Sequence, residues 1–329
     1  MKKIYLTLLA VLATMFYACE TEQGQNEEEF VTISLRVGGE LKETQTPLMR
    51  GAESRALYGI QINATDGKDE IVYAHGLFDD LANVTVQLAK NKTYNMDMTY
   101  IPNAKDVIHY YGDYNPSQDY WELPFNSAGW TNTPLNVMQY GPNQSFTSLG
   151  GGWNTPKGYG NDRSHSWHNE VDRYYGVLKN YVPKEGGTAT ISMKRCVFGL
   201  TFRANRIDGQ EYKKLLIQLD ADADCLSLYP KKYYLSIDQT TATSELVIPL
   251  ICMWEPWLAI QSDDYTESFK ISIGTDNNPS EIYFGDITIK RNTMHTFEFD
   301  AMKPEIIPNG LVPNIENSPM MDGETVDLN

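Results

Sequence analysis

The feature that most constrains this chain is an alternation of apolar and polar residues with a period of two. Val31, Ile33, Leu35 and Val37 are separated by polar residues, and the same pattern recurs along most of the chain. This period places successive side chains on opposite faces of a β-strand, one toward a core and one toward water. The other segments with this alternation are 84–88, 96–100, 191–193, 198–204, 271–273, 287–289 and 297–299.

Between these segments the chain carries turn-forming residues instead of long helices. Runs of Gly, Asn, Asp, Lys and Pro at 63–67, 184–187 and 276–279 are typical of tight turns. No segment has the period of a long amphipathic helix, and two or three helical turns at 169–180 are the most we expect. Short strands joined by polar turns predict an all-β fold built from antiparallel sandwiches.

A chain of 329 residues is long enough for about two domains. The second of the three turns divides the strand segments into two groups, which predicts two tandem β-sandwiches. We expect the N-terminal sandwich at 30–186, with a long insertion at 109–175, and the C-terminal sandwich at 187–302. The tail, 303–329, contains four prolines, which predicts an extended chain or one short strand near 310–315.

The first 18 residues, 1–18, have the composition of a signal peptide. Two lysines precede an uncharged, mostly apolar run that would span about 22 Å as a helix, short of the roughly 30 Å hydrocarbon core of a membrane. The run leads into Phe-Tyr-Ala-Cys, which resembles a bacterial lipobox and predicts that Cys19 carries an outer-membrane lipid anchor. The alternative is an ordinary cleavage site followed by an incidental cysteine.

Residues 19–29 are rich in acids and poor in apolar groups. Five of the ten residues after Cys19 are glutamates, so this segment cannot bury a core and is expected to be a solvated tether. Such a stretch is similar to the surface-export signal of Bacteroidetes lipoproteins, and a plain linker is the alternative. The formal net charge is −16, so we expect no nucleic-acid partner, because phosphates would repel the chain.

Residues of the kinds that serve catalysis and metal binding are scarce. The cysteines beyond the lipobox are Cys196, Cys225 and Cys252, whose odd number allows one disulfide but favours three buried thiols. No nucleophile motif, zinc motif or phosphate-binding loop occurs in the sequence. We therefore expect no catalytic residue, no metal and no cofactor, and a protein that is not an enzyme.

The insertion at 109–175 is unusually aromatic. It contains 14 aromatic residues among its 67, against 12% of the whole chain, and four of the six tryptophans. Aromatic faces stack on sugar rings, which makes Trp121, Trp130, Trp153 and Trp167 candidate glycan-binding residues. We favour the alternative that these rings form a small core of their own, because no spacing defines a sugar platform.

The order of these features is similar to that of a known family. After Cys19 and the acidic tether come a first strand at 31–37, an arginine-marked loop at 49–56, a strand pair at 189–195 and 197–203, and a closing strand at 292–299. This order resembles the fimbrillin-like lipoproteins of Bacteroidales, the subunits and anchors of type V pili. The likeness covers most of the chain and consists of degenerate patterns.

The resemblance implies two transthyretin-like sandwiches in tandem, on a lipoprotein exposed at the cell outer membrane or in a fimbrium. It also implies that an arginine-specific protease cuts the loop behind the first strand, for which Arg55 and Arg50 are the candidates. Removal of that strand would open a groove that an extended segment of another pilus subunit fills by β-strand complementation. The tail at 303–329 is a candidate for the donor. An anchor subunit that stays uncut is the alternative within the family.

Two functional hypotheses follow. The first is a structural or accessory subunit of a type V pilus that assembles by strand exchange and acts in adhesion to a host or bacterial surface glycan or protein. The alternative is a surface glycan-binding lipoprotein of a polysaccharide-uptake system. Arg50 and Arg55 favour the first hypothesis, and the tryptophans of the insertion favour the second.

Overall fold

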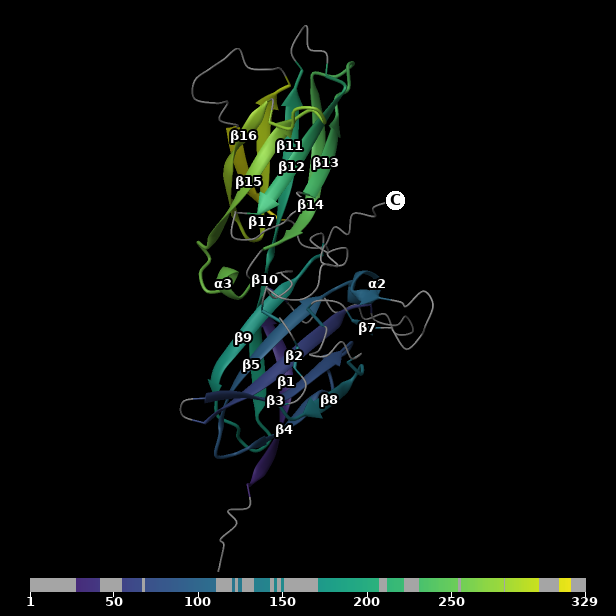
Figure 1. Cartoon of the computed structure of the whole chain (residues 1–329). Helices are drawn as coiled ribbons and strands as arrows, with labels where there is room; N and C mark the ends of the chain where they lie inside the picture. Colours follow the sequence, from purple (N-terminus) through teal and green to yellow (C-terminus); the bar gives the residue numbers. More distant parts are fainter. Residues whose placement is uncertain are drawn as a thin grey trace, which may run out of the picture.

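The computed structural model shows a chain built mostly of β-strands (Figure 1), which confirms the predicted all-β fold. It describes residues 28–41, 55–66, 69–110, 120–121, 124–125, 133–142, 145–146, 149–150, 171–206, 212–221, 231–253, 256–280, 282–301 and 314–320. The strands are β1 (Phe30–Gly39), β2 (Leu57–Asp66), β3 (Asp69–Phe78), β4 (Thr85–Ala89), β5 (Thr93–Ile101), β6 (His109–Tyr110), β7 (Tyr120–Trp121), β8 (Val137–Tyr140), β9 (Tyr174–Tyr181), β10 (Thr188–Arg195), β11 (Val197–Asn205), β12 (Lys214–Ala221), β13 (Lys231–Ser236), β14 (Thr243–Cys252), β15 (Thr266–Gly274), β16 (Tyr283–Lys290), β17 (Thr293–Asp300) and β18 (Asn314–Pro319). The described helices are α2 (Ala104–Val107) and α3 (Pro256–Ala259). Neither of these helices has the length and apolar character needed to reach across a bilayer.

The N-terminal unit is an eight-stranded sheet in the order β4-β1-β10-β9-β5-β2-β3-β8, seen in the lower half of Figure 1. Its strands alternate as predicted: along β1, Val31, Ile33 and Leu35 are only 1–2% exposed. The apolar residues of β2, β4, β5 and β10 close around them in one core. Burial of each such aliphatic side chain contributes about 1.5–3 kcal/mol, which favours a sheet curled around its own apolar face.

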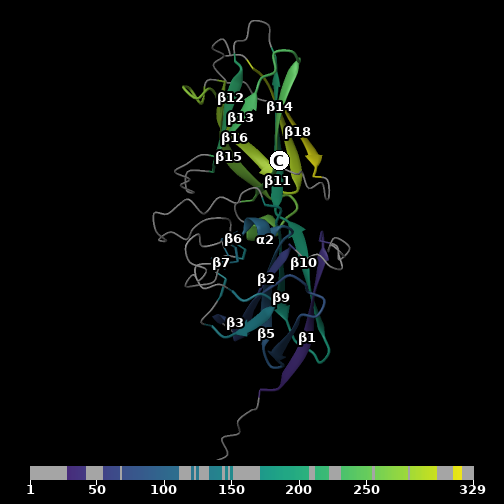
Figure 2. The ribbon, with the colours of Figure 1, turned by 90° about the vertical axis from the view of Figure 1, so that its right-hand side faces the viewer.

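The C-terminal unit is a sandwich of two four-stranded sheets, in the orders β14-β11-β17-β18 and β13-β12-β15-β16. Inward-facing residues of both sheets meet in one core, where the rings of Phe202 and Phe297 stack with centroids 5.4 Å apart. The two units lie end to end in an elongated molecule (Figures 1 and 2). The chain passes from β10 into β11 where they meet, with Cys196 as the single residue between these strands.

Seven strands of the C-terminal unit repeat the connectivity of the N-terminal unit. The first strand, β1 or β11, lies between the fourth strand, β4 or β14, and the last strand of the repeat, β10 or β17. The second strand, β2 or β12, pairs with the third and the fifth strand in both units. No residue-level repeat is visible in the sequence, because many apolar side chains satisfy the same alternation.

Three details of the strand arrangement differ from the sequence-based expectations. The pairs β1–β10 and β11–β17 are parallel, so neither unit is purely antiparallel. Strand β10 lies in the N-terminal sheet, paired with β1 and β9, and not in the second sandwich as predicted. The turn at 184–187 is the hairpin turn between β9 and β10, in which the Gly187 N–H donates to the Lys184 carbonyl (2.9 Å). Most of the segment predicted as helical turns is β9, because pairing with β5 and β10 outweighs local propensity.

The aromatic insertion supplies strand β8 to the N-terminal sheet, and other described residues of it pack on the outer face of that sheet. Trp121, Phe125, Phe146 and Leu149 are buried there in a third apolar cluster with Leu77 of β3. The same cluster extends to residues of β11 and β14. These described residues of the insertion therefore cover the sheet and also contact the C-terminal unit.

The tail contributes strand β18, which pairs antiparallel with the outer edge of β17. It overlaps the short strand predicted near 310–315 and ends at Pro319, a position where a strand tolerates proline. In the sheet order β18 lies beside β17 as β9 lies beside β10. The last strand of each repeat thus has a further strand on its outer side. In the N-terminal unit this strand is β9, which precedes β10 in the chain, whereas in the C-terminal unit it is β18, which follows β17.

Candidate functional site

Strand β1 is the element on which the predicted site depends. It lies between β4, to which it runs antiparallel, and β10, to which it runs parallel. Hydrogen bonds around it include the Leu35 N–H to the Val84 carbonyl (3.2 Å) and the Ser34 N–H to the Gly187 carbonyl (3.0 Å). Taking β1 out would leave two unpaired strand edges and an open apolar slot, which together form a template for another strand.

Strand β4 is also held from the side that faces away from β1. The Gln87 N–H donates to the Tyr140 hydroxyl (3.1 Å), and the Tyr73 hydroxyl donates to the Gln87 carbonyl (2.8 Å). The Ala89 N–H donates to the Tyr94 hydroxyl (2.8 Å). We call Tyr73, Tyr94 and Tyr140 the tyrosine clasp. Because they come from β3, β5 and β8, they attach β4 to the rest of the sheet without using β1.

Arg55, one of the two predicted cleavage residues, lies at the surface just before β2. Its side chain is 73% exposed, and its Nη1 lies 2.8 Å from Oδ2 of Asp106. Its carbonyl accepts a hydrogen bond from the Lys105 N–H (3.0 Å). The next residue, Ala56, is 2% exposed and belongs to the N-terminal core. A protease that cuts after Arg55 therefore finds an accessible arginine, but the start of β2 has to open locally.

Helix α2 and its ion pairs hold the chain around Arg55 in place. The Lys105 Nζ lies 2.8 Å from Oδ2 of Asp79, and the Asn136 amide donates to the same carboxylate (2.8 Å). Burial raises the pKa of Asp79, but the hydrogen bonds from Lys105 and Asn136 outweigh it and hold that pKa below its ordinary value. Asp79 is therefore ionised at neutral pH and supports the position of α2.

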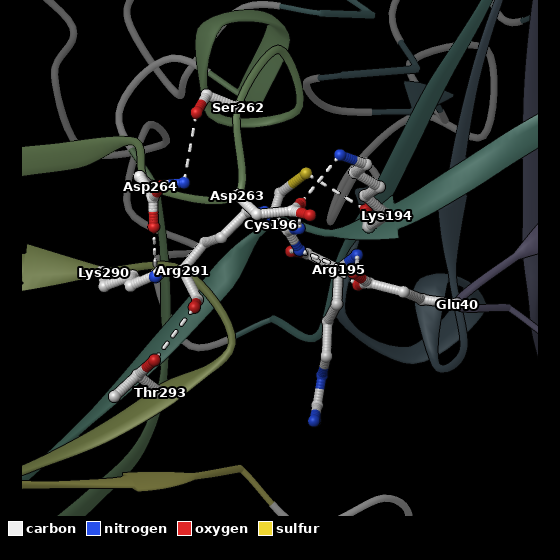
Figure 3. A network of polar contacts seen from close by, with 10 residues as sticks. All are labelled: Glu40, Lys194, Arg195, Cys196, Ser262, Asp263, Asp264, Lys290, Arg291 and Thr293. Carbon is white, nitrogen blue, oxygen red and sulfur yellow. Dashed lines mark hydrogen bonds and ion pairs between the residues drawn. The ribbon is translucent and has the colours of Figure 1, made fainter.

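A cluster of charged residues lies at the end of β1, where the two units meet (Figure 3). Glu40 follows β1, and its carboxylate accepts hydrogen bonds from Nη1 of Arg291 (2.9 and 3.0 Å) and from the backbone N–H of Arg195 (2.8 Å). Nη2 of Arg291 and Nζ of Lys194 both donate to Asp263 (2.6 and 2.9 Å). We call these five residues the junction cluster. It ties the end of β1 and β10 to loops of the C-terminal unit.

The sequence gives no motif for the junction cluster. Glu40 and Arg291 are 251 residues apart, so no local spacing connects them. One local signal could have drawn attention to Glu40, since it is the first acidic residue after the alternation of β1. That signal alone indicates the end of a strand and does not name a partner.

The other predicted site residues are placed as follows. Those outside the described residues are Cys19, Arg50, Trp130, Trp153 and Trp167. Trp121 is 8% exposed, its indole N–H donates to the Thr133 carbonyl (3.2 Å), and its ring centroid lies 4.4 Å from that of His109. Trp121 is therefore a core residue of the insertion and does not present its ring to solvent.

Of the described cysteines, Cys196 directly follows Arg195 of the junction cluster, and Cys252 pairs with Val197. Neither Cys196 nor Cys252 forms a disulfide, and both are buried, while Cys225 lies outside the described residues. Burial raises the pKa of the Cys196 thiol far above its ordinary value, so this sulfur stays protonated and unreactive. These two cysteines thus have the surroundings of packing residues.

Comparison with known proteins finds no matching family model and no matching curated protein. Among the solved structures to which the chain is similar are two fimbrial proteins from Porphyromonas gingivalis. The fimbrial anchor protein Mfa2 is 9% identical, with 82% of this chain and 91% of its own covered and a TM-score of 0.38. The tip fimbrial protein Mfa3, with a C-terminal truncation, is 9% identical, with 88% of this chain and 99% of its own covered and a TM-score of 0.33. A likeness of this degree carries no argument about function, which has to come from the chain's own geometry.

Proposed function

We propose that this chain is a surface-exposed fimbrial subunit or accessory protein that joins neighbouring subunits by exchange of strand β1 and serves in cell adhesion. The observation that carries the proposal is the place of β1 in the sheet. It is the first strand of the chain that the structure describes, it lies inside the sheet between β4 and β10, and the exposed Arg55 follows it. A cut after Arg55 or Arg50 would end the covalent connection between β1 and the rest of the fold.

After such a cut, hydrogen bonds and packing alone would hold β1. Its departure would unpair the facing edges of β4 and β10 and uncover the core in which Val31, Ile33 and Leu35 are buried. Unpaired backbone groups and exposed apolar surface are both unfavourable, so the slot would bind an extended segment with a period of two. The tyrosine clasp supports this step because it keeps β4 in its place when β1 leaves.

The proposal includes an outer-membrane lipid anchor at Cys19 with the acidic tether between the lipid and the fold. It assigns no catalytic step and no cofactor to the chain. The alternative, a glycan-binding lipoprotein of a polysaccharide-uptake system, rests on Trp130, Trp153 and Trp167, because Trp121 is buried. Unchanged mobility of Trp→Ala variants in affinity electrophoresis on several polysaccharides would contradict that alternative.

Digestion with an arginine-specific protease tests strand exchange. Mature protein is expected to gain a new N-terminus at Ala56 or Gly51 and to run as a ladder on a denaturing gel when it is not boiled. The double variant Arg50→Ala, Arg55→Ala should show neither effect. Arg206→Ala removes an exposed arginine elsewhere in the chain and should behave like the wild type. The proposal would be contradicted if the protease did not cut the wild-type protein and no ladder appeared.

A further inference from the structure

The junction cluster links β1 to the C-terminal unit through one carboxylate. Glu40 directly follows β1, and its N–H donates to the Met193 carbonyl of β10 (2.8 Å). Both of its carboxylate oxygens lie within 3.0 Å of Nη1 of Arg291, and one of them also accepts the Arg195 N–H (Figure 3). A segment that leaves with β1 and extends through residue 40 therefore takes this carboxylate out of the junction.

Loss of the Glu40 carboxylate would be unfavourable for Arg291, because water cannot easily replace it. Its side chain is 5% exposed, in the turn between β16 and β17. The second carboxylate that pairs with Arg291 belongs to Asp263. This side chain is 77% exposed and also pairs with Lys194, so water and a second cation compete for it. Burial lowers the pKa of Arg291, but hydrogen bonds to Glu40 and Asp263 outweigh burial and raise it, so the guanidinium stays charged. A buried charge that loses a partner strongly destabilises the fold around it.

Resting on the proposed exchange of β1, we infer that the empty slot selects a donor segment that brings a carboxylate to the place of Glu40. The partner is an extended segment that runs parallel to β10, with aliphatic residues at the places of Val31, Ile33 and Leu35. An Asp or Glu follows the last of these by five positions, as Glu40 follows Leu35.

The two parts of this recognition have different roles. Apolar contacts and backbone hydrogen bonds favour any strand of the right period, because they depend little on side-chain identity. The carboxylate distinguishes between such strands, because a donor that lacks it leaves the Arg291 guanidinium with the neutral Arg195 carbonyl (3.3 Å) and the exposed, shared Asp263 carboxylate. A correct donor thus restores the contact between the two units as well as the sheet.

Peptide exchange in the nicked full-length chain tests the inference. A recognition site for a site-specific protease is placed between Gln45 and Thr46, the protein is cut there, and displacement of the held β1 segment by labelled peptides of residues 28–45 is measured. The native peptide is expected to bind at least about tenfold more tightly than the Glu40→Gln peptide. Glu29→Gln is the matched control, since it removes a 72% exposed carboxylate paired with Lys90 and should change affinity by less than about twofold.

A protein variant assigns the effect to the buried charge. In nicked Arg291→Met protein, the native and Glu40→Gln peptides are expected to bind within about twofold of each other, because the buried guanidinium that pairs with Glu40 has been removed. Equal binding of these two peptides to the wild-type chain would overturn the carboxylate requirement and leave strand exchange standing. If neither peptide displaces β1 from the wild-type chain, strand exchange itself is wrong, and the inference is overturned with it.

Discussion

The ion pairs of this chain differ in how far water reaches them. Arg203 and Glu245 form a pair on the surface of the C-terminal unit, where both side chains are more than a third exposed. Such pairs contribute little, because water screens them and ordering two long side chains costs entropy. Arg291 is 5% exposed, so water screens its hydrogen bonds to Glu40 only weakly, and their loss lowers the free energy of unfolding.

The first prediction concerns Glu40 in the intact chain. We expect Glu40→Gln to lower the free energy of unfolding by about 1–2 kcal/mol, because Arg291 stays buried while its better-sheltered carboxylate becomes neutral. Urea denaturation measures this change. The matched variant Glu245→Gln should cost less than about 0.5 kcal/mol. Equal losses in both variants would show that the burial of Arg291 has no influence.

Asp79 leads to a prediction about pH. Its pKa is below the ordinary value of 3.8, because hydrogen bonds from Lys105 and Asn136 outweigh the effect of burial. A carboxyl whose pKa is lower in the folded state stabilises the fold above the unfolded-state pKa, and this stabilisation is lost as the pH falls through the folded-state pKa. We expect Asp79→Asn to be less stable than the wild type at neutral pH. The difference should shrink below pH 3.8 in urea denaturation at a series of pH values, and a constant difference would contradict this explanation.

At the scale of elements, β1 and β4 are held in different ways. Strand β1 has a strand on each side, whereas β4 has β1 on one side and the tyrosine clasp on the other. The free edge of a strand recruits other chains through its unpaired backbone groups, and the clasp hydroxyls occupy such groups at Gln87 and Ala89. The clasp therefore hinders the addition of another strand to this side of β4.

Loss of one clasp hydroxyl is the third prediction. We expect Tyr94→Phe to lower stability by about 1 kcal/mol and to speed hydrogen exchange of the Ala89 amide, because that N–H loses its acceptor. Tyr181→Phe is the control, since its hydroxyl makes no hydrogen bond among the described residues. If the Ala89 amide exchanges equally fast in both variants, the clasp does not hold β4.

The alternation of apolar residues predicted most strand segments, because facing a core every second residue is a local requirement. It did not predict which strands pair. Strand β10 has the same pattern as β11, and only its partners β1 and β9 show that it belongs to the N-terminal sheet. The helical expectation at 169–180 was wrong for the same reason, since β9 is stabilised by strands on both sides.

At the scale of the whole molecule, each unit contains seven equivalent strands, but the strand that covers the outer edge of the last one has a different origin in each unit. Strand β10 pairs with β9 of its own repeat, whereas β17 pairs with β18 from the tail. The tail is thus part of the C-terminal sheet in this structure. A role for the tail as donor would require β18 to leave β17, which unpairs the edge from Thr293 to Glu298.

The fourth prediction is that removal of β18 makes the chain associate with itself. A truncation after Ala301 leaves the outer edge of β17 unpaired, and such an edge pairs readily with another chain. We expect larger species in size-exclusion chromatography with light scattering as the concentration rises. A truncation after Met320 retains β18 and should elute as the full chain does apart from its smaller mass. Identical elution of both truncations would show that β18 does not protect the edge.

The sequence by itself determined the all-β content, because the alternation of apolar and polar residues depends on neighbouring residues along the chain. Only the tertiary structure decided that β10 completes the first sheet beside β1 and that Glu40 meets Arg291, 251 residues away. The physical reason is that strand edges and buried charges find partners through the folded arrangement. The local sequence indicates where a strand or a charged residue lies, but it does not indicate which distant segment pairs with it.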